Sequence, residues 1–146
     1  MNFKTFSKER YDELLDMMSE FYTSDAVAHP IPFKTIKKLL DDIISQNYLV
    51  KGLEVYYEGN LVGFGITTSY YASEVAGITV QLEDLYIQKE YRSKGIAKKY
   101  FNYIMNNNPE AVRFRLEVSP SNTRAIELYN KMGFDKLEYN QMIFDL

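Results

Sequence analysis

Apolar residues recur along the chain with two different periods, and the change from one period to the other marks the expected secondary structure. Period-two spacing predicts strands over residues 2–6, 48–57, 61–70 and 78–87. Helical spacing predicts one helix that ends near residue 23 and a second over 33–47. Residues 23–32 contain two prolines, break both periods and predict a loop. The first half of the chain is therefore expected to fold as a strand, two helices and three antiparallel strands.

The second half alternates between helices and strands. A helix is expected from about Gly95 to residue 107, a strand over 112–118, and a last helix that begins at Ser121 or Asn122 and ends at Gly133. Residues 136–146 suggest two short strands, the second of which carries apolar side chains at Met142, Phe144 and Leu146. Because a helix joins the strands at 78–87 and 112–118, these two strands are expected to be parallel. The pattern predicts one α/β domain over 1–146, with a mostly antiparallel sheet and about four helices.

The strand at 78–87 changes phase partway along its length. Ile78, Val80 and Leu82 share one face by period-two spacing, whereas the next apolar residues, Leu85 and Ile87, fall on the opposite phase. The slip lies at Glu83-Asp84, and an extra residue in one strand, a β-bulge, produces such a slip. A bulge leaves a backbone group without its ladder partner, and that group is free to bind a ligand.

Positive charge gathers where the next helix begins. The chain carries 17 Lys and Arg against 20 Asp and Glu, yet in this short region Glu90 alone opposes five basic residues, namely Lys89, Arg92, Lys94, Lys98 and Lys99. Free backbone N–H groups, the positive end of the helix dipole and these side chains together favour an anion. Gly95 lets an anion approach the backbone closely. The first hypothesis is therefore a ligand that carries phosphate.

Composition excludes several classes of function. The chain has no Cys, which excludes a disulfide scaffold, a thiol nucleophile and a Cys-based metal centre, and with one His no metal site is expected. Neither a signal peptide nor an apolar run of about 18 residues is present in the sequence, so we expect a soluble, cytoplasmic protein without membrane contact. Because the basic cluster is local and the formal net charge is −3, we expect no nucleic-acid partner.

Two motifs resemble the GNAT superfamily of acyl-CoA-dependent N-acetyltransferases. Arg92-x-x-Gly95-x-Ala97 resembles the pyrophosphate loop of that family, and the strand before it resembles the family's bulged fourth strand. A second stretch, from Leu116 to Phe134, resembles the family's strand followed by Asn, Ala, Leu-Tyr and Gly-Phe. The resemblance covers residues from about 50 to 146 and implies acetyl-CoA as co-substrate, a primary amine as acceptor and direct transfer in a ternary complex.

The resemblance also implies a role for each residue that matches a motif. The Tyr129 hydroxyl would meet the thiolate that leaves, and Asn122 would hydrogen-bond the pantetheine arm. These two residues lie seven apart on one helix, about 10 Å at 1.5 Å per residue, so one extended ligand can touch both. Backbone groups of Leu85, Tyr86 and Ile87 would pair with the pantetheine amides. The pyrophosphate would be held by the amides of Arg92, Ser93, Lys94, Gly95, Ile96, Ala97 and Lys98.

The acceptor amine is protonated at neutral pH and needs a base before it can attack. Glu83, at the slip, is the first candidate, and Glu117 is the second because the family's ribosomal-protein acetyltransferases carry a Glu in a similar Leu-Glu-Val stretch. Asp84 and Asp25 are weaker candidates, which could instead bind a cationic acceptor. The residues expected to bind the acceptor are Asp25, His29, Tyr70 and Glu83.

Plainer interpretations stay open beside these. Asn122 could act only as a helix cap, Tyr129 as a core aromatic and Glu117 as a surface strand residue, while Tyr70 and Tyr71 could merely cover the sheet. The alternative function is a non-catalytic acyl-CoA-binding sensor or an interaction domain. The pattern leaves open whether the protein is a monomer or a homodimer, although the C-terminal strands could pair between subunits.

Overall fold

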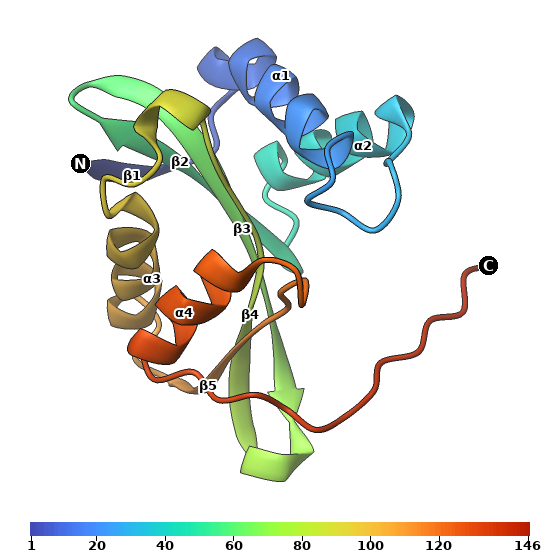
Figure 1. The fold of residues 1–146 in the computed structure, drawn as a ribbon. Coiled ribbons are helices and arrows are strands. Elements are labelled where there is room, and N and C mark those ends of the chain that lie inside the picture. The colour runs from blue at the N-terminus through green and yellow to red at the C-terminus, as the bar shows by residue number, and fades with distance from the viewer.

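The computed structural model describes residues 1–146, and its centre is one sheet of five strands (Figure 1). The strands lie in chain order across the sheet as β1 (Asn2–Thr5), β2 (Val50–Tyr57), β3 (Asn60–Ala72), β4 (Gly77–Ile87) and β5 (Ala111–Leu116). Neighbours from β1 to β4 are antiparallel, whereas β4 and β5 are parallel. The expected mixed α/β fold with a mostly antiparallel sheet is confirmed.

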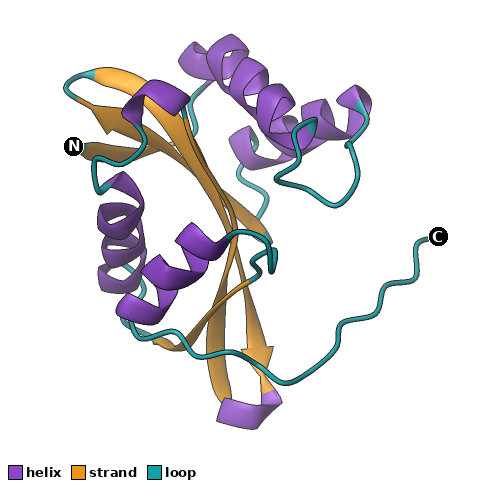
Figure 2. Ribbon diagram, viewed as in Figure 1, coloured by secondary structure: helices purple, strands orange, loops and turns teal.

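Four helices cover the two faces of the sheet (Figure 2). Helices α1 (Tyr11–Tyr22) and α2 (Phe33–Ile44) lie on one face, and α3 (Ile96–Asn106) and α4 (Thr123–Lys131) lie on the other. Three short 3-10 turns, η1 (Lys8–Arg10), η2 (Ser73–Val75) and η3 (Lys89–Tyr91), connect these elements. No helix combines the length and apolar composition that a membrane span requires.

Each face of the sheet has its own hydrophobic core, because β-strand side chains alternate between faces. The core under α1 and α2 contains Leu14, Met18, Leu40 and Phe64, all 0% exposed. The core under α3 and α4 is built around Tyr100, Phe101, Val80 and Leu82. Helix α4 packs on this second core with partly buried side chains only. The sheet itself therefore separates the two helical layers.

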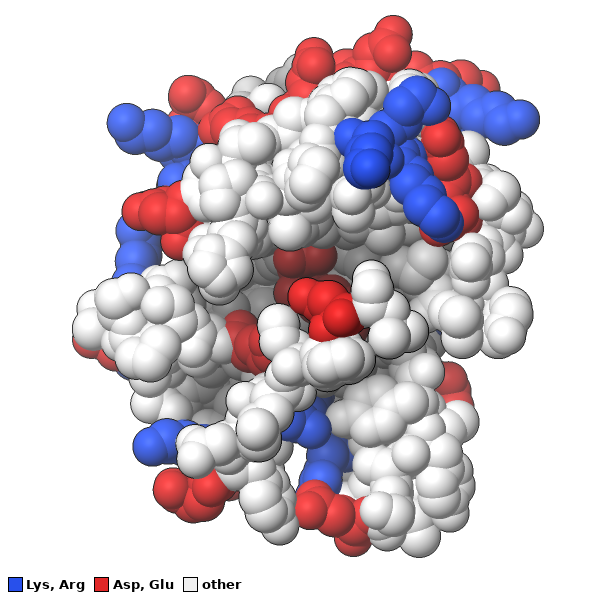
Figure 3. All heavy atoms as spheres, turned by 90° about the vertical axis from the view of Figure 1, so that its right-hand side faces the viewer, with Lys and Arg blue, Asp and Glu red and all other residues white.

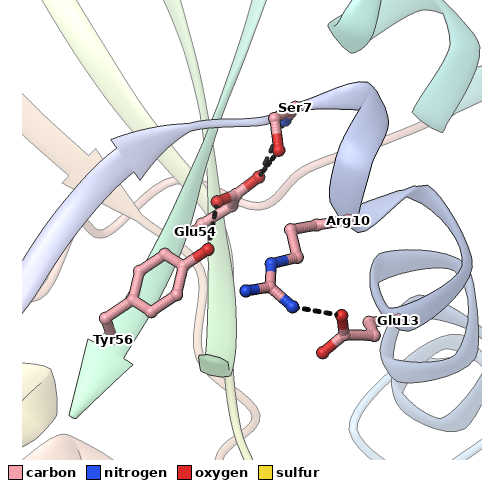
Figure 4. A network of polar contacts seen from close by, with 5 residues as sticks. All are labelled: Ser7, Arg10, Glu13, Glu54 and Tyr56. Atoms are coloured by element: carbon pink, nitrogen blue, oxygen red, sulfur yellow. Dashed lines mark hydrogen bonds and ion pairs between the residues drawn. The ribbon is translucent and has the colours of Figure 1, made fainter. Parts of the chain in front are cut away.

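A buried carboxylate fastens the start of the chain to the sheet (Figure 4). Glu54 on β2 is 1% exposed and accepts hydrogen bonds from the Ser7 backbone N–H at 2.7 Å, the Ser7 hydroxyl at 2.8 Å and the Tyr56 hydroxyl at 2.8 Å. Arg10 and Glu13 form an ion pair at 2.6 Å beside this group. Because a buried charge is costly unless it is hydrogen-bonded, these donors hold the turn before α1 against β2.

The end of the chain differs from the sequence expectation. Residues 136–146 contain no strand, and every residue from 135 to 146 is exposed. Figure 1 shows this segment leaving the body of the molecule in an extended path. The expectation of two strands was wrong for this structure because an alternating pattern forms a strand only where another strand pairs with its N–H and C=O groups. The expected strand at 112–118 is also shorter and ends at Leu116.

Candidate active site

The predicted bulge lies on β4 at the expected residue. Ile66 on β3 pairs with Asp84 and Thr67 pairs with Leu82, so Glu83 has no partner between them. The phase slip in the sequence is therefore a true β-bulge, and it turns Leu85 and Ile87 to the opposite phase of the strand.

The β-bulge also marks the place where the two parallel strands part. The last pair between β4 and β5 is Leu82 with Leu116, so from Glu83 to Ile87 the strand β4 has a neighbour only on its β3 side. Figure 1 shows the two strands diverging there. The predicted pantetheine-binding residues Leu85, Tyr86 and Ile87 all lie on this free edge of β4. Backbone groups along such an edge can pair with an extended ligand.

The free edge leads within a few residues to the start of α3. Gly95 precedes the helix at φ +73°, and a Cβ placed there would meet nothing within 4 Å. The first helical hydrogen bond runs from Lys99 N–H to Gly95 C=O at 3.2 Å. The N–H groups of Ile96, Ala97 and Lys98 therefore have no acceptor within the helix. These amides and the open Gly95 surface form a cradle of a size and polarity that suit a phosphate group.

The basic cluster around this cradle stays free of acidic partners. None of Lys89, Arg92, Lys94, Lys98 and Lys99 forms an ion pair in the structure. The Arg92 Nε donates to the Ile87 carbonyl at 2.7 Å, with its guanidinium 6.0 Å from the Tyr86 ring centre, and the Lys94 ammonium lies 5.6 Å from the Tyr57 ring centre. Their charge is therefore available to an anionic ligand.

A cation from α4 joins this loop, and no pattern in the sequence indicates it. The Arg124 Nη2 donates to the Ser93 hydroxyl at 2.6 Å. Ser93 has φ +68°, a left-handed conformation that is uncommon outside glycine. The Arg124 contact fixes a strained residue of the loop and ties α4 to the cradle. Only the tertiary fold reveals it, because 31 residues separate the two side chains.

Asn122 and Tyr129 occupy the expected places on α4. The Asn122 side chain accepts from the Ala125 N–H at 3.2 Å, so it caps the helix as the plainer interpretation proposed. Tyr129 packs against Phe101 at 5.4 Å between ring centres and against Phe134 at 5.9 Å. Burial raises the pKa of its hydroxyl, which makes no hydrogen bond within the chain. The Tyr129 hydroxyl therefore stays protonated and can donate a hydrogen bond to a ligand.

Two neighbouring carboxylates at the bulge have different surroundings. Glu83 is exposed and accepts from the Thr68 hydroxyl at 2.6 Å. Asp84 is partly buried and accepts from the Tyr22 hydroxyl of α1 at 2.6 Å. Burial raises the pKa of Asp84 to about 6; the Tyr22 hydrogen bond works against this rise and the charge of Glu83 adds to it. Burial therefore favours the protonated form of Asp84, which was a weaker candidate from sequence.

The remaining predicted residues lie after β5, in the loop after α1 and on β3. Glu117 is exposed, one residue beyond β5, and forms no hydrogen bond. Asp25 and His29 are both exposed in the loop after α1. Tyr70 pairs with Thr79, four residues before Glu83, which corresponds to about 13 Å along the strand. Because Leu116 pairs with Leu82, Glu117 lies beside the bulge that Glu83 and Asp84 form, whereas Tyr70 lies outside this group.

Another buried hydroxyl, also missed from sequence, lies under the sheet. Tyr100 of α3 is 0% exposed and its hydroxyl has no hydrogen-bond partner. A Cβ at Gly65 would lie 2.2 Å from that oxygen, so the glycine on β3 makes room for it. Burial and the charge of Asp84 raise the pKa of Tyr100.

Acidic groups mark the face that lies on the right-hand side of Figure 1. Figure 3 shows this face hollowed near its centre, with Asp and Glu atoms in and around the hollow and most Lys and Arg atoms towards the edges. A face of this kind attracts cations.

Known proteins resemble the chain in sequence and in fold. Residues 11–134 match the model of the Acetyltransferase (GNAT) family. The probable spermine N(1)-acetyltransferase of Bacillus subtilis subsp. natto (strain BEST195) is 32% identical over 116 residues, which cover 73% of this chain and 75% of that protein. The spermine/spermidine N(1)-acetyltransferase of Bacillus subtilis (strain 168) is 31% identical over the same length and the same shares.

Solved structures share the fold over nearly the whole chain. A possible acetyltransferase from Clostridium difficile 630 superposes with a TM-score of 0.83 at 19% identity, covering 99% of this chain and 97% of that one. AAC(6')-Iy in complex with the bisubstrate analog CoA-S-monomethyl-acetylneamine gives a TM-score of 0.78 at 15% identity, with the same coverage of both chains.

Proposed function

The chain belongs to the acetyltransferase (GNAT) family and is an acyltransferase, and we propose that it passes the acetyl group of acetyl-CoA directly to a primary amine. The observation that carries this proposal is the continuous path from the bulge at Glu83, along the free edge of β4, to the unpaired amides at the start of α3. One long ligand with a reactive end and a phosphorylated end matches such a path.

The phosphate end of acetyl-CoA would lie in the cradle around Gly95. The amides of Ile96, Ala97 and Lys98 would donate to the pyrophosphate, and the basic cluster would neutralise its charge. Arg124 would keep Ser93 in place for these contacts. Backbone groups of Leu85, Tyr86 and Ile87 would pair with the pantetheine amides, as another strand would.

The transfer step needs a proton acceptor at the amine and a proton donor at the sulfur. The neutral amine attacks the thioester carbonyl carbon, a C–N bond forms, and the C–S bond breaks with its electron pair going to sulfur. Tyr129 would donate its proton to the departing thiolate, and a base would take the proton that the amine loses. No covalent enzyme intermediate is needed, since the chain has no Cys and the amine is itself the nucleophile.

We place the base at the bulge and assign the role to Asp84, with Glu83 attracting the ammonium form of the acceptor. A base works best when its pKa lies near the working pH, and burial raises that of Asp84 to about 6. Tyr22 orients this carboxylate through the 2.6 Å hydrogen bond. This order differs from the sequence ranking, which favoured Glu83 and then Glu117, because the burial of Asp84 depends on α1.

For the acceptor we propose an aliphatic polyamine. Two relatives that are 32% and 31% identical to this chain over 116 residues are named for spermine or spermidine. The acidic hollow on the α1 and α2 side of the molecule suits an acceptor with several ammonium groups (Figure 3). An amine with a single charge would lose the attraction that a second and third ammonium group provide.

The test is a thiol-release assay with acetyl-CoA and a panel of spermine, spermidine, an aminoglycoside, a peptide and a monoamine. We expect the polyamines to give the highest kcat/KM. Acetyl-CoA binding without thiol release for any member of the panel would favour the non-catalytic acyl-CoA sensor, and release without an acceptor would indicate thioester hydrolysis. The same panel with propionyl-CoA measures the preference for the acetyl group.

A matched pair of glycine variants tests the phosphate cradle. Gly95 and Gly59 both have positive φ, +73° and +85°, and a Cβ added at either position would have open space around it. Only Gly95 borders the start of α3, so Gly95→Glu should weaken acetyl-CoA binding by about 100-fold or more while Gly59→Glu leaves it unchanged. Equal binding by the two variants would refute the assignment of the cradle.

A further inference from the structure

The sheet face that carries the bulge extends beyond the two helices that cover it. Helices α1 and α2 lie over one end of this face, whereas the ends of β3 and β4 near η2 carry no helix there (Figure 1). By pairing and strand alternation, the side chains on this uncovered part are Thr68, Tyr70, Thr79, Gln81, Arg113 and Arg115. All six end in a polar group, so this part of the sheet, the polar sheet face, is built for contact with polar groups.

Two buried side chains of the polar sheet face lack hydrogen-bond partners. Thr79 is 0% exposed, and its hydroxyl has no partner within the chain. Gln81 is 8% exposed, and its side-chain amide likewise makes no hydrogen bond. Buried polar groups are normally hydrogen-bonded, and an unpaired one is unfavourable. The polar sheet face therefore offers donors and acceptors that a ligand can satisfy.

Arg115 is the cation of the polar sheet face that no carboxylate neutralises. Its neighbour Arg113 forms an ion pair with Glu74 at 2.8 Å. Arg115 instead donates to the Tyr70 hydroxyl at 3.4 Å, a long contact that a charged acceptor can replace. Tyr70, expected from the sequence to bind the acceptor, thus contacts this guanidinium and not the bulge. The donors of a guanidinium fit a carboxylate, which they bind in pairs.

The charge along β4 changes sign between the bulge and the polar sheet face. Glu83 and Asp84 lie at the bulge, whereas Arg115 pairs with Gln81, two residues before Glu83 and about 7 Å away along the strand. Figure 3 shows basic atoms below the acidic hollow of this face. A molecule with an ammonium group at one end and a carboxylate about 7 Å away would meet the opposite charge at both ends.

We propose that the acceptor site also takes amines that carry a carboxylate about 7 Å from the nitrogen, and that Arg115 and the Gln81 amide bind this carboxylate. The amine would lie at the bulge beside Asp84. This inference rests on the proposed function and adds a second class of acceptor to it. A polyamine would stay within the acidic hollow, because Arg115 repels a further ammonium group.

The first test compares two acceptors that differ only in the carboxylate. 6-Aminohexanoate has this group at the required distance, whereas 6-aminohexanamide has the same length and a neutral end. In the thiol-release assay, the native kcat/KM should favour 6-aminohexanoate by at least about 20-fold, and Arg115→Gln should reduce this ratio to within about twofold. Lysine and a dipeptide then show whether a side-chain amine or an N-terminal amine is the better natural source of this chemistry.

A control variant removes a cation from the opposite face of the sheet. Lys51 is exposed there and pairs with Thr67, which in turn pairs with the core residue Leu82. Lys51→Gln should therefore keep the native ratio. Arg115→Lys retains the charge and should keep a preference of at least about fivefold. Far-UV circular dichroism checks that each variant is folded. Equal use of the two acceptors by the native protein, or a preference that survives in Arg115→Gln, overturns the proposal.

Calorimetry in the presence of CoA separates this proposal from the proposed function, because CoA carries no acetyl group and neither acceptor can react. The native protein should bind 6-aminohexanoate at least about 10-fold more tightly than 6-aminohexanamide, and Arg115→Gln should remove the difference. If no amine is acetylated in any assay, the proposed function fails, while this binding result still decides the role of Arg115. Equal affinity of the native protein for the two compounds overturns the proposal.

Discussion

Replacing Asp84 by Asn tests the proposed base, which accepts a hydrogen bond from Tyr22. The change keeps the size of the side chain and lets the amide oxygen accept from Tyr22, but removes the titrating group. The Asp84 pKa is about 6 in the folded protein against an ordinary value of 3.8. One pKa unit corresponds to about 1.4 kcal/mol, so this difference changes the free energy of unfolding by at most about 3 kcal/mol. The value is an upper limit because solvent reaches part of the side chain.

The sign of the effect on stability follows from the direction of the shift. An acid whose pKa is raised on folding binds its proton more tightly in the folded state, so its contribution is present below about pH 4 and is lost as the pH rises through about 6. The Asp84→Asn variant lacks this loss. From pH 4 to pH 7 its free energy of unfolding should therefore improve relative to the native chain by up to about 2 kcal/mol, measured by urea unfolding at each pH.

The same variant tests the chemistry. The native kcat/KM should rise with pH to a plateau with a midpoint near 6, and the variant should lose that inflection and about 10²- to 10⁴-fold in rate. Glu83→Gln is the comparison variant: it should keep the inflection but move it to lower pH, because the charge of Glu83 adds to the rise in the Asp84 pKa, and it should raise the KM for the acceptor. A stability difference that does not change with pH, or a variant rate within twofold of the native rate, would refute the role of Asp84.

Three other variants test separate parts of the structure. Tyr129→Phe should lower kcat by about 10- to 100-fold with little change in the KM for acetyl-CoA, because it removes a proton donor and keeps the packing; an unchanged kcat would remove Tyr129 from the mechanism. Arg124→Gln should raise the Kd for CoA about 5- to 20-fold in calorimetry, since a charge-assisted hydrogen bond to Ser93 is lost; an unchanged Kd would make that contact dispensable. Ser7→Ala should lower the free energy of unfolding by about 1 to 2 kcal/mol, because Glu54 loses one donor while remaining buried. Ser121→Ala is the control for Ser7→Ala, because Ser121 is exposed and its replacement should lower the free energy of unfolding by less than about 0.5 kcal/mol.

Local patterns predicted most of the fold and the order of its elements. The slip between Leu82 and Leu85 located the bulge to the two residues Glu83-Asp84, because strand side chains alternate strictly and an inserted residue must change the phase. The unpaired amides at the start of α3 could also be predicted from Gly95 and the basic residues around it. Residues that are close in sequence determine both where a helix starts and how much charge gathers there.

Contacts between distant segments could not be predicted in this way. Asp84 draws its raised pKa from burial under α1, and Tyr22 lies 62 residues away from it. The contact of Arg124 with Ser93 likewise depends on how α4 packs. The failed prediction at residues 136–146 has the same cause, since alternation reports which face of a strand is apolar and says nothing about what lies beside it.

The contact between Arg124 and Ser93 joins the loop before α3 to the helix that carries Tyr129. Binding of the nucleotide part of acetyl-CoA to this loop would therefore restrict the motion of Tyr129 on α4. The binding energy of that non-reacting part would then help to orient the Tyr129 hydroxyl towards the sulfur. A truncated thioester such as acetyl-pantetheine should accordingly turn over slowly even at saturation, and free adenosine 3',5'-bisphosphate should accelerate it.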